Sequence, residues 1–200
     1  GFVAWILGDD TAYQKGRVTF NPLRHIDPFG TVALPALLLL FQAPFLFGWA
    51  KPVPVAFHRL RWPRRDMVLV AAAGPGVNLV LAVVSAILMN LAVLAPDTLA
   101  RWLLENLVNS VFINLILAAF NMLPLPPLDG GRVAVGLLPQ SLALPLARLE
   151  RYGLFIIIGV VFLVPMLGNQ LGMDLNVFYW VILRPVLWLL PNFWALGGIE

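Results

Sequence analysis

Cysteine is absent from the 200 residues, and charged side chains are scarce, at 12% of the chain. The absence of cysteine excludes disulfide bonds and thiolate metal ligands. Ordinary soluble domains carry about 25% charged residues, whereas 60% of this chain is hydrophobic and its mean hydropathy is +0.88. A soluble protein of this length could not bury so much apolar surface, so the composition predicts an all-α polytopic membrane protein.

Long apolar runs and polar segments alternate along what we interpret as a single membrane-embedded domain, residues 1–200. Residues 67–95 and 107–128 are each long enough to span a membrane as a helix. Residues 153–194 are expected to form a further pair of helices that crosses out and back. The sequence therefore predicts about four transmembrane segments.

The distribution of lysine and arginine predicts the orientation of these segments. The segments with several basic residues are expected to face the cytosol; they are 9–30, 51–66 and 129–152. The apolar run 31–50 lies between the first two and contains Pro35 and Pro44, so we predict a re-entrant hairpin. Basic and aromatic residues alternate near Trp62, but the membrane-like surroundings argue against a nucleic-acid partner.

The beginning of the chain predicts two local structures. The stretch "GFVAWIL" reads as the last turns of a helix that Gly8 closes at its C-terminal end. Tyr13 and the run Val18-Thr19-Phe20 flank Lys15-Gly16, a pattern typical of a short β-hairpin over residues 11–20. We therefore expect a hairpin and loop on the cytosolic side within 9–30.

The stretch "LPLPPLDGGR" (residues 123–132) places a lone carboxylate, Asp129, where the apolar run 107–128 ends. Its three prolines stop a helix, and Gly130 and Gly131 permit close backbone approach. A carboxylate beside a membrane segment is costly unless it is paired, solvated or bound to a metal. Asp-Gly alone is typical of a loop turn, but the whole stretch favours a functional Asp129.

Two further polar features interrupt the apolar helices. The stretch "AGPGVN" (residues 73–78) is expected to weaken or bend its helix, and by spacing alone a kinked packing site is the favoured interpretation. Asn114 and Asn121 are seven residues apart and share one helical face. Asn121 is expected to share the surroundings of Asp129, with an interhelical hydrogen bond as the alternative.

The two histidines, His25 and His58, belong to no recognisable metal-binding motif, because neither is followed by the spacing H-E-x-x-H. Together with Asp129 they would form a metal site only if the fold brought all three together. We expect solvated or hydrogen-bonded loop histidines instead. In the last apolar segment, Arg184 is expected to reach the membrane surface or to pair with Asp174.

Four stretches occur in a fixed order along residues 7–132: "LGDDTAYQKGRVTFNPLRHIDPFG", "GWAKPVPV", "AGPGVN" and "FNMLPLPPLDGGR". Each alone is a weak signal, but the ordered set is specific. It resembles the site-2 protease family of intramembrane zinc metalloproteases, in the compact bacterial branch that has no inserted PDZ domain. The matching stretches are spread over about two-thirds of the chain.

The resemblance implies a zinc site to which Asp129 contributes. In that family, two histidines of an H-E-x-x-H helix and the aspartate of an N-x-x-P-x-P-x-L-D-G motif hold zinc, and that aspartate corresponds to Asp129. The glutamate of H-E-x-x-H would be the general base. In relatives this motif precedes a "GxxAxxLGD" stretch, which resembles residues 1–9. We therefore expect an N-terminally truncated fragment that has no catalytic residue of its own and is inactive alone.

The resemblance also implies contacts with a substrate. Asn121 corresponds to the motif asparagine and would hold the substrate backbone near zinc. The 11–20 hairpin would offer a strand edge to an unwound substrate segment. The re-entrant segment 31–50 would gate the site.

The implied activity is hydrolysis of peptide bonds in or near the transmembrane segments of other proteins, such as membrane-tethered regulators or signal-peptide remnants. The implied location is the bacterial inner membrane, with the active site toward the cytosol, and the partners are substrate segments and lipid. Two other classes stay open at this point: a transporter or channel built on broken helices, and a non-catalytic membrane scaffold.

Overall fold

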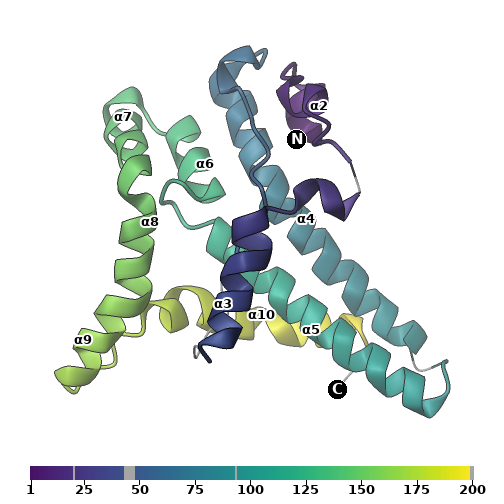
Figure 1. The fold of residues 1–200 in the computed structure, drawn as a ribbon. Helices are drawn as coiled ribbons and strands as arrows, with labels where there is room; N and C mark the ends of the chain where they lie inside the picture. Colours follow the sequence, from purple (N-terminus) through teal and green to yellow (C-terminus); the bar gives the residue numbers. More distant parts are fainter. Residues whose placement is uncertain (20, 43–47, 93, 199–200) are drawn as a thin grey trace. The chain divides into compact units, whose positions relative to one another are not determined.

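The computed structural model describes residues 1–19, 21–42, 48–92 and 94–198. The chain divides into two compact units, Gly1–Val70 and Ala71–Glu200. All regular secondary structure within those described ranges is helical (Figure 1). The predicted all-α class is therefore confirmed.

Short helices and ordered loops make up the first unit. Its first helix ends at Ile6, and Gly8, which follows the C-cap residue Leu7, has a φ of +112° and donates its N–H to the carbonyl of Trp5 at 3.1 Å. The predicted helix and its closing glycine are therefore confirmed. The elements of this unit are α1 (Phe2–Ile6), α2 (Thr11–Gln14), η1 (Pro22–His25), η2 (Pro28–Ala33), α3 (Leu34–Leu40) and η3 (Phe57–Arg59).

The carboxylate of Asp9 ties together segments of the first unit that are distant in sequence. Asp9 is fully buried. Its Oδ2 accepts the N–H of Ala56 at 2.6 Å, and its Oδ1 accepts both the N–H of Thr11 at 3.0 Å and the Thr11 hydroxyl. Burial alone would raise the pKa of Asp9. These hydrogen bonds and the charge of Arg59 outweigh it and lower that pKa.

The β-hairpin predicted over residues 11–20 is wrong in the described part of that range. Thr11–Gln14 form helix α2, and no strand follows through residue 19. Two local contacts explain the difference: Asp9 accepts the first N–H of the turn, and the ring of Tyr13 stacks on Trp5 at 4.9 Å. They hold this segment in a helical turn against α1, whereas Phe20 lies outside the described residues.

The segment predicted to be re-entrant returns close to its starting point. The N–H of Trp49 donates to the carbonyl of Gly30 at 3.0 Å, and the N–H of Lys51 donates to the carbonyl of His25 at 2.9 Å. Residues 43–47 of this segment lie outside the described residues. Entry of 31–50 into a membrane stays a prediction.

Helix α4 (Pro63–Ala92) leads from the first unit into the second, which contains all the later helices. It continues through Gly74-Pro75-Gly76 without a break in its assignment. Helix α5 follows after a short turn (Figure 1). The remaining elements, with α5 first, are α5 (Asp97–Asn121), α6 (Asp129–Leu137), α7 (Gln140–Arg148), α8 (Glu150–Ile158), η4 (Gly159–Leu163), α9 (Val164–Gln170), η5 (Tyr179–Leu183) and α10 (Arg184–Leu196).

Three helices in the described residues are long and apolar enough to cross a membrane: Pro63–Ala92, Asp97–Asn121 and Glu150–Gly168. The membrane character of the protein is therefore confirmed, whereas the predicted number of about four spans is not. Many of the exposed side chains on these helices are large and apolar, including Val80, Ile87 and Leu91 on α4. Helices that are apolar on nearly every face are suited to lipid rather than to water.

Small side chains let α4, α5 and α10 pack together. The buried cluster combines Ala82, Ala86 and Met89 of α4 with side chains of α5 and α10; those are Val111, Leu115, Val186 and Leu190. The hydroxyls of Ser85 and Ser110 add a hydrogen bond of 2.8 Å between α4 and α5. Small residues and polar pairs of this kind hold helices together where the surrounding solvent is lipid.

We predict that Asp9→Asn lowers the free energy of unfolding by about 2 kcal/mol, because an amide cannot replace a buried carboxylate that accepts three hydrogen bonds. Asp10→Asn is the matched control. Its ion pair with Arg59 has side chains that are 45% and 49% exposed, so its loss should cost less than about 1 kcal/mol. Thermal unfolding of both variants in detergent at neutral pH measures the difference, and equal losses would contradict the prediction.

The same substitution predicts a pH dependence. The folded-state pKa of Asp9 is lowered, so its contribution is complete above the unfolded pKa of about 4 and is lost as the pH falls through the folded value. Between neutral pH and acid below about pH 4, the parent should therefore lose more stability than Asp9→Asn.

Candidate metal centre

The prolines of residues 123–132 end one helix and place Asp129 at the start of the next. Helix α5 ends at Asn121, seven residues before the end of the predicted span 107–128. The loop that follows contains two turns, in which Leu125 donates to Leu123 at 2.8 Å and Leu128 donates to Leu125 at 3.0 Å. Asp129 is the first residue of α6. The predicted helix break is confirmed.

Gly130 and Gly131 let α6 lie directly against this loop. Both glycines are buried. A Cβ on Gly130 would overlap the carbonyl of Met122, and a Cβ on Gly131 would overlap the backbone nitrogen of Pro126. The predicted close backbone approach is therefore present. It fixes the start of α6, where Asp129 directly precedes the two glycines.

Helix α4 reaches Asp129 through Gly74. A Cβ on Gly74 would lie 2.8 Å from Oδ2 of Asp129, which is closer than real Cβ contacts allow. The stretch "AGPGVN" is thus a packing site, which is the interpretation that its spacing favoured. The side chain that packs against it is that of Asp129, the candidate metal ligand. Sequence reasoning missed this contact. The signal that pointed to it is a glycine inside a long helical pattern, which usually has a packing reason.

The carboxylate of Asp129 is half-buried, and no N–H or O–H from the described part of the chain donates to it. Burial raises the pKa of Asp129, and the positive charge of Arg132 partly offsets that increase. No fully buried side-chain oxygen in the described residues lacks a partner, so the Asp129 oxygens keep access to solvent. A carboxylate with open acceptor positions in a glycine-lined corner fits the role of one metal ligand.

The two histidines lie in the first unit, whereas Asp129 lies in the second. His25 lies in η1, where its Nε2 is 3.1 Å from the carbonyl oxygen of Thr19, and His58 lies in η3. Among the residues that the structure describes, no three histidine, aspartate or glutamate side chains gather as a metal-binding group would require. Asp129 remains the one predicted metal ligand of this chain.

Asn121 and Asn114 use their side chains within α5. The Nδ2 of Asn121 donates to the carbonyl of Leu117 at 3.0 Å, and the Nδ2 of Asn114 donates to that of Ser110 at 2.8 Å. Asn121 is the last residue of the helix. Its side chain therefore lies at the start of the loop that leads to Asp129.

Arg184 differs from its predicted pairing. Its guanidinium carbon lies 4.8 Å from the ring centre of Trp180, one helical turn earlier, whereas Oδ1 of Asp174 accepts the N–H of Asn176 at 3.2 Å. The expected ion pair between Arg184 and Asp174 is not among those of the described residues. A cation–π contact holds this charge within an apolar segment instead.

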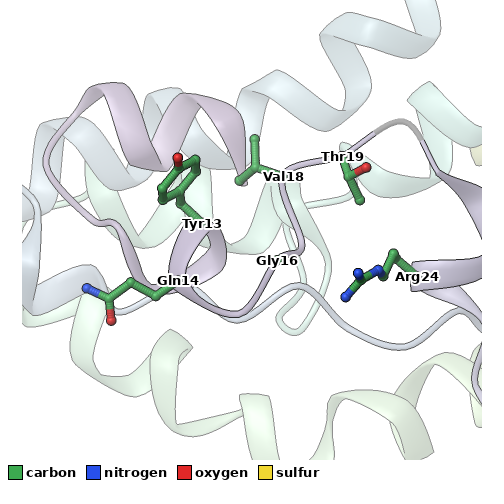
Figure 2. A pocket seen from close by; sticks show the side chains of 6 residues that line it. All are labelled: Tyr13, Gln14, Gly16, Val18, Thr19 and Arg24. Carbon is green, nitrogen blue, oxygen red and sulfur yellow. The ribbon is translucent and has the colours of Figure 1, made fainter.

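A separate shallow hollow of about 480 Å³ lies within the first unit, where the hairpin had been predicted. Figure 2 shows the guanidinium of Arg24 extending toward the turn at Gly16, and a Cβ on Gly16 would lie 3.6 Å from Nη1 of Arg24. The lining is mixed polar and apolar and carries no carboxylate; it consists of Tyr13, Gln14, Gly16, Val18, Thr19 and Arg24. Without a strand here, the predicted edge for strand addition is absent from residues 11–19.

Comparison with known proteins identifies the family. Residues 91–166, which include both Asn121 and Asp129, match Peptidase family M50. A Bacillus subtilis (strain 168) protein named "Putative zinc metalloprotease YwhC" is 40% identical over 179 residues, which are 88% of this chain and 78% of that protein. The chain belongs to peptidase family M50. The predicted site-2 protease family and the metalloprotease class are therefore confirmed.

Other relatives carry the same description. "Putative zinc metalloprotease Rip2" of Mycolicibacterium smegmatis is 30% identical over 170 residues, which are 84% of this chain and 62% of that protein. "Putative zinc metalloprotease MJ0611" of Methanocaldococcus jannaschii is 45% identical over 102 residues, 48% of this chain and 49% of that protein. These names agree with zinc as the metal expected for an M50 protein, and no solved structure matches the chain. M50 membership favours the protease over the transporter, channel and scaffold alternatives.

Proposed function

We propose that this M50 chain forms the membrane core of an intramembrane zinc metalloendopeptidase and that Asp129 is one of its zinc ligands. The observation that supports the proposal most directly is the carboxylate of Asp129, which is half-buried against Gly74, accepts no hydrogen bond from the described residues and keeps access to solvent. Zinc bound there would polarise the scissile carbonyl and activate a water for attack.

The chain's own residues account for part of this machinery. The 200 residues contain no H-E-x-x-H segment, so the two other ligands and the general base that the family uses are not supplied by these residues. We propose that the chain alone has no peptidase activity. Experiments on cleavage therefore use the full-length protein.

The site lies at the end of a candidate span. Helix α5 is long and apolar enough to cross a membrane, and it ends eight residues before Asp129. The basic residues Arg132, Arg148 and Arg151 follow in the same polar segment, which supports a cytosolic position in a bacterial inner membrane. Substrates are then transmembrane segments of other membrane proteins, cleaved within or near the bilayer.

We predict that Asp129→Ala in the full-length protein weakens zinc binding by at least about 100-fold and abolishes cleavage of a model transmembrane substrate, because it removes a direct ligand. Asp97→Ala is the matched control, since Asp97 is also the first residue of a helix in the same unit and is exposed. Zinc content and cleavage, measured side by side, should be normal in the control. Normal zinc binding by Asp129→Ala would contradict the proposed ligand.

A second prediction concerns Asn121, which we propose binds the substrate backbone. Asn121→Ala should lower kcat/KM by about 5- to 10-fold, the effect of losing one hydrogen bond to the substrate. Zinc content should stay at the parental level, because the side chain does not reach Asp129 through any hydrogen bond of the described residues. Unchanged cleavage would show that Asn121 serves only its own helix.

A third prediction uses two glycines of α4. Gly74→Ala should displace the Asp129 carboxylate, since the new Cβ would lie 2.8 Å from Oδ2, and a displaced ligand should weaken zinc binding by about 10-fold. Gly76→Ala, two residues away, meets no atom within 4 Å and should bind zinc normally. Competition with a zinc chelator measures both affinities. The prediction fails if the two variants have the same zinc affinity.

A further inference from the structure

Helix α8 contacts the loop that leads to Asp129 through a glycine, Gly153. A Cβ on Gly153 would overlap the carbonyl oxygen of Pro126 and would also crowd Cδ of Pro127. Gly153 is buried, and Pro126 is among the most completely buried side chains of the described chain. Backbone lies directly on backbone here, so the position of α8 and the position of the loop depend on each other.

Pro126 also contacts α6 on its other side. A Cβ on Gly131 would overlap the nitrogen of Pro126 and would lie 2.6 Å from its Cδ. Pro126 is therefore held between Gly131 of α6 and Gly153 of α8. Asp129 lies between Pro126 and Gly131 in sequence, so the candidate ligand belongs to the segment that these two contacts hold.

An ion pair joins the same two helices. Nη2 of Arg132 lies 3.0 Å from Oε1 of Glu150, with side chains that are 32% and 51% exposed. Arg132 is one helical turn after Asp129, and Glu150 is one turn before Gly153. The ion pair and the glycine contact thus connect α8 to the Asp129 segment at neighbouring points.

We propose that α8 positions the metal ligand, with Gly153 as the positioning residue and the Arg132–Glu150 pair as a second connection. The inference rests on the proposed role of Asp129 as a zinc ligand. Zinc–ligand distances in protein sites stay within about 0.2 Å of their standard values, so a helix that fixes the ligand's loop should also influence the affinity for zinc. Most of α8 lies within residues 153–194, for which the sequence analysis predicted only a pair of membrane-crossing helices.

The test compares two glycines of one continuous helical run in the full-length protein. Gly153→Ala forces α8 away from Pro126, whereas Gly159→Ala meets no atom within 4 Å. We expect Gly153→Ala to weaken zinc affinity by about 10-fold or more, as measured by chelator competition, and excess zinc should restore part of its cleavage activity. Gly159→Ala should match the parent in both measurements. Parental zinc affinity in folded Gly153→Ala would overturn the inference.

A milder pair of variants decides the matter if Gly153→Ala does not fold. Glu150→Lys reverses one charge of the exposed ion pair and should weaken zinc affinity several-fold, whereas the conservative Glu150→Asp should keep the parental value. Equal affinity of Glu150→Lys and the parent would then overturn the inference. Asp129→Ala is measured alongside: if it keeps zinc, the proposed function itself fails, and if it alone loses zinc, only the role of α8 fails.

Discussion

Close contact between helix backbones and a proline-rich loop is the constraint on which the candidate site depends. Gly130 and Gly131 of α6 and Gly153 of α8 each lie where any Cβ would overlap the backbone of residues 122–126. The loop has few hydrogen bonds of its own, so its neighbours determine its course. This packing positions the carboxylate of Asp129, which contacts Gly74 of α4.

The features that could be predicted from the sequence are those that depend on local chemistry. Apolar runs at 67–95 and 107–128 correspond to α4 and α5, because only helices satisfy the backbone of such segments in lipid. The break before Asp129 was predictable because proline removes donors wherever it lies. The closing glycine of α1 was predictable for a similar reason, since Gly8 adopts a backbone conformation that other residues avoid.

The features that could not be predicted depend on contacts between distant residues. The alternation around Lys15-Gly16 is typical of a hairpin, but Asp9 and the stack of Tyr13 on Trp5 hold a helical turn instead. Nothing in the local pattern of α4 indicates that Gly74 lies against Asp129. Arg184, at the start of α10, likewise contacts Trp180 of the preceding element η5, although Asp174 offered the obvious opposite charge.

The length of α5 adds a mechanical consequence. Its 25 residues extend over about 37 Å, whereas the hydrocarbon core of a typical bilayer is about 30 Å thick. The extra length places the charged first turns of α5, with Asp97, Arg101 and Glu105, toward the membrane surface, and the apolar remainder adjusts to the thickness of the surrounding membrane by tilting or by local thinning of the bilayer. Because the loop that carries Asp129 begins where α5 ends, the thickness of the bilayer becomes a physical input to the geometry of the site.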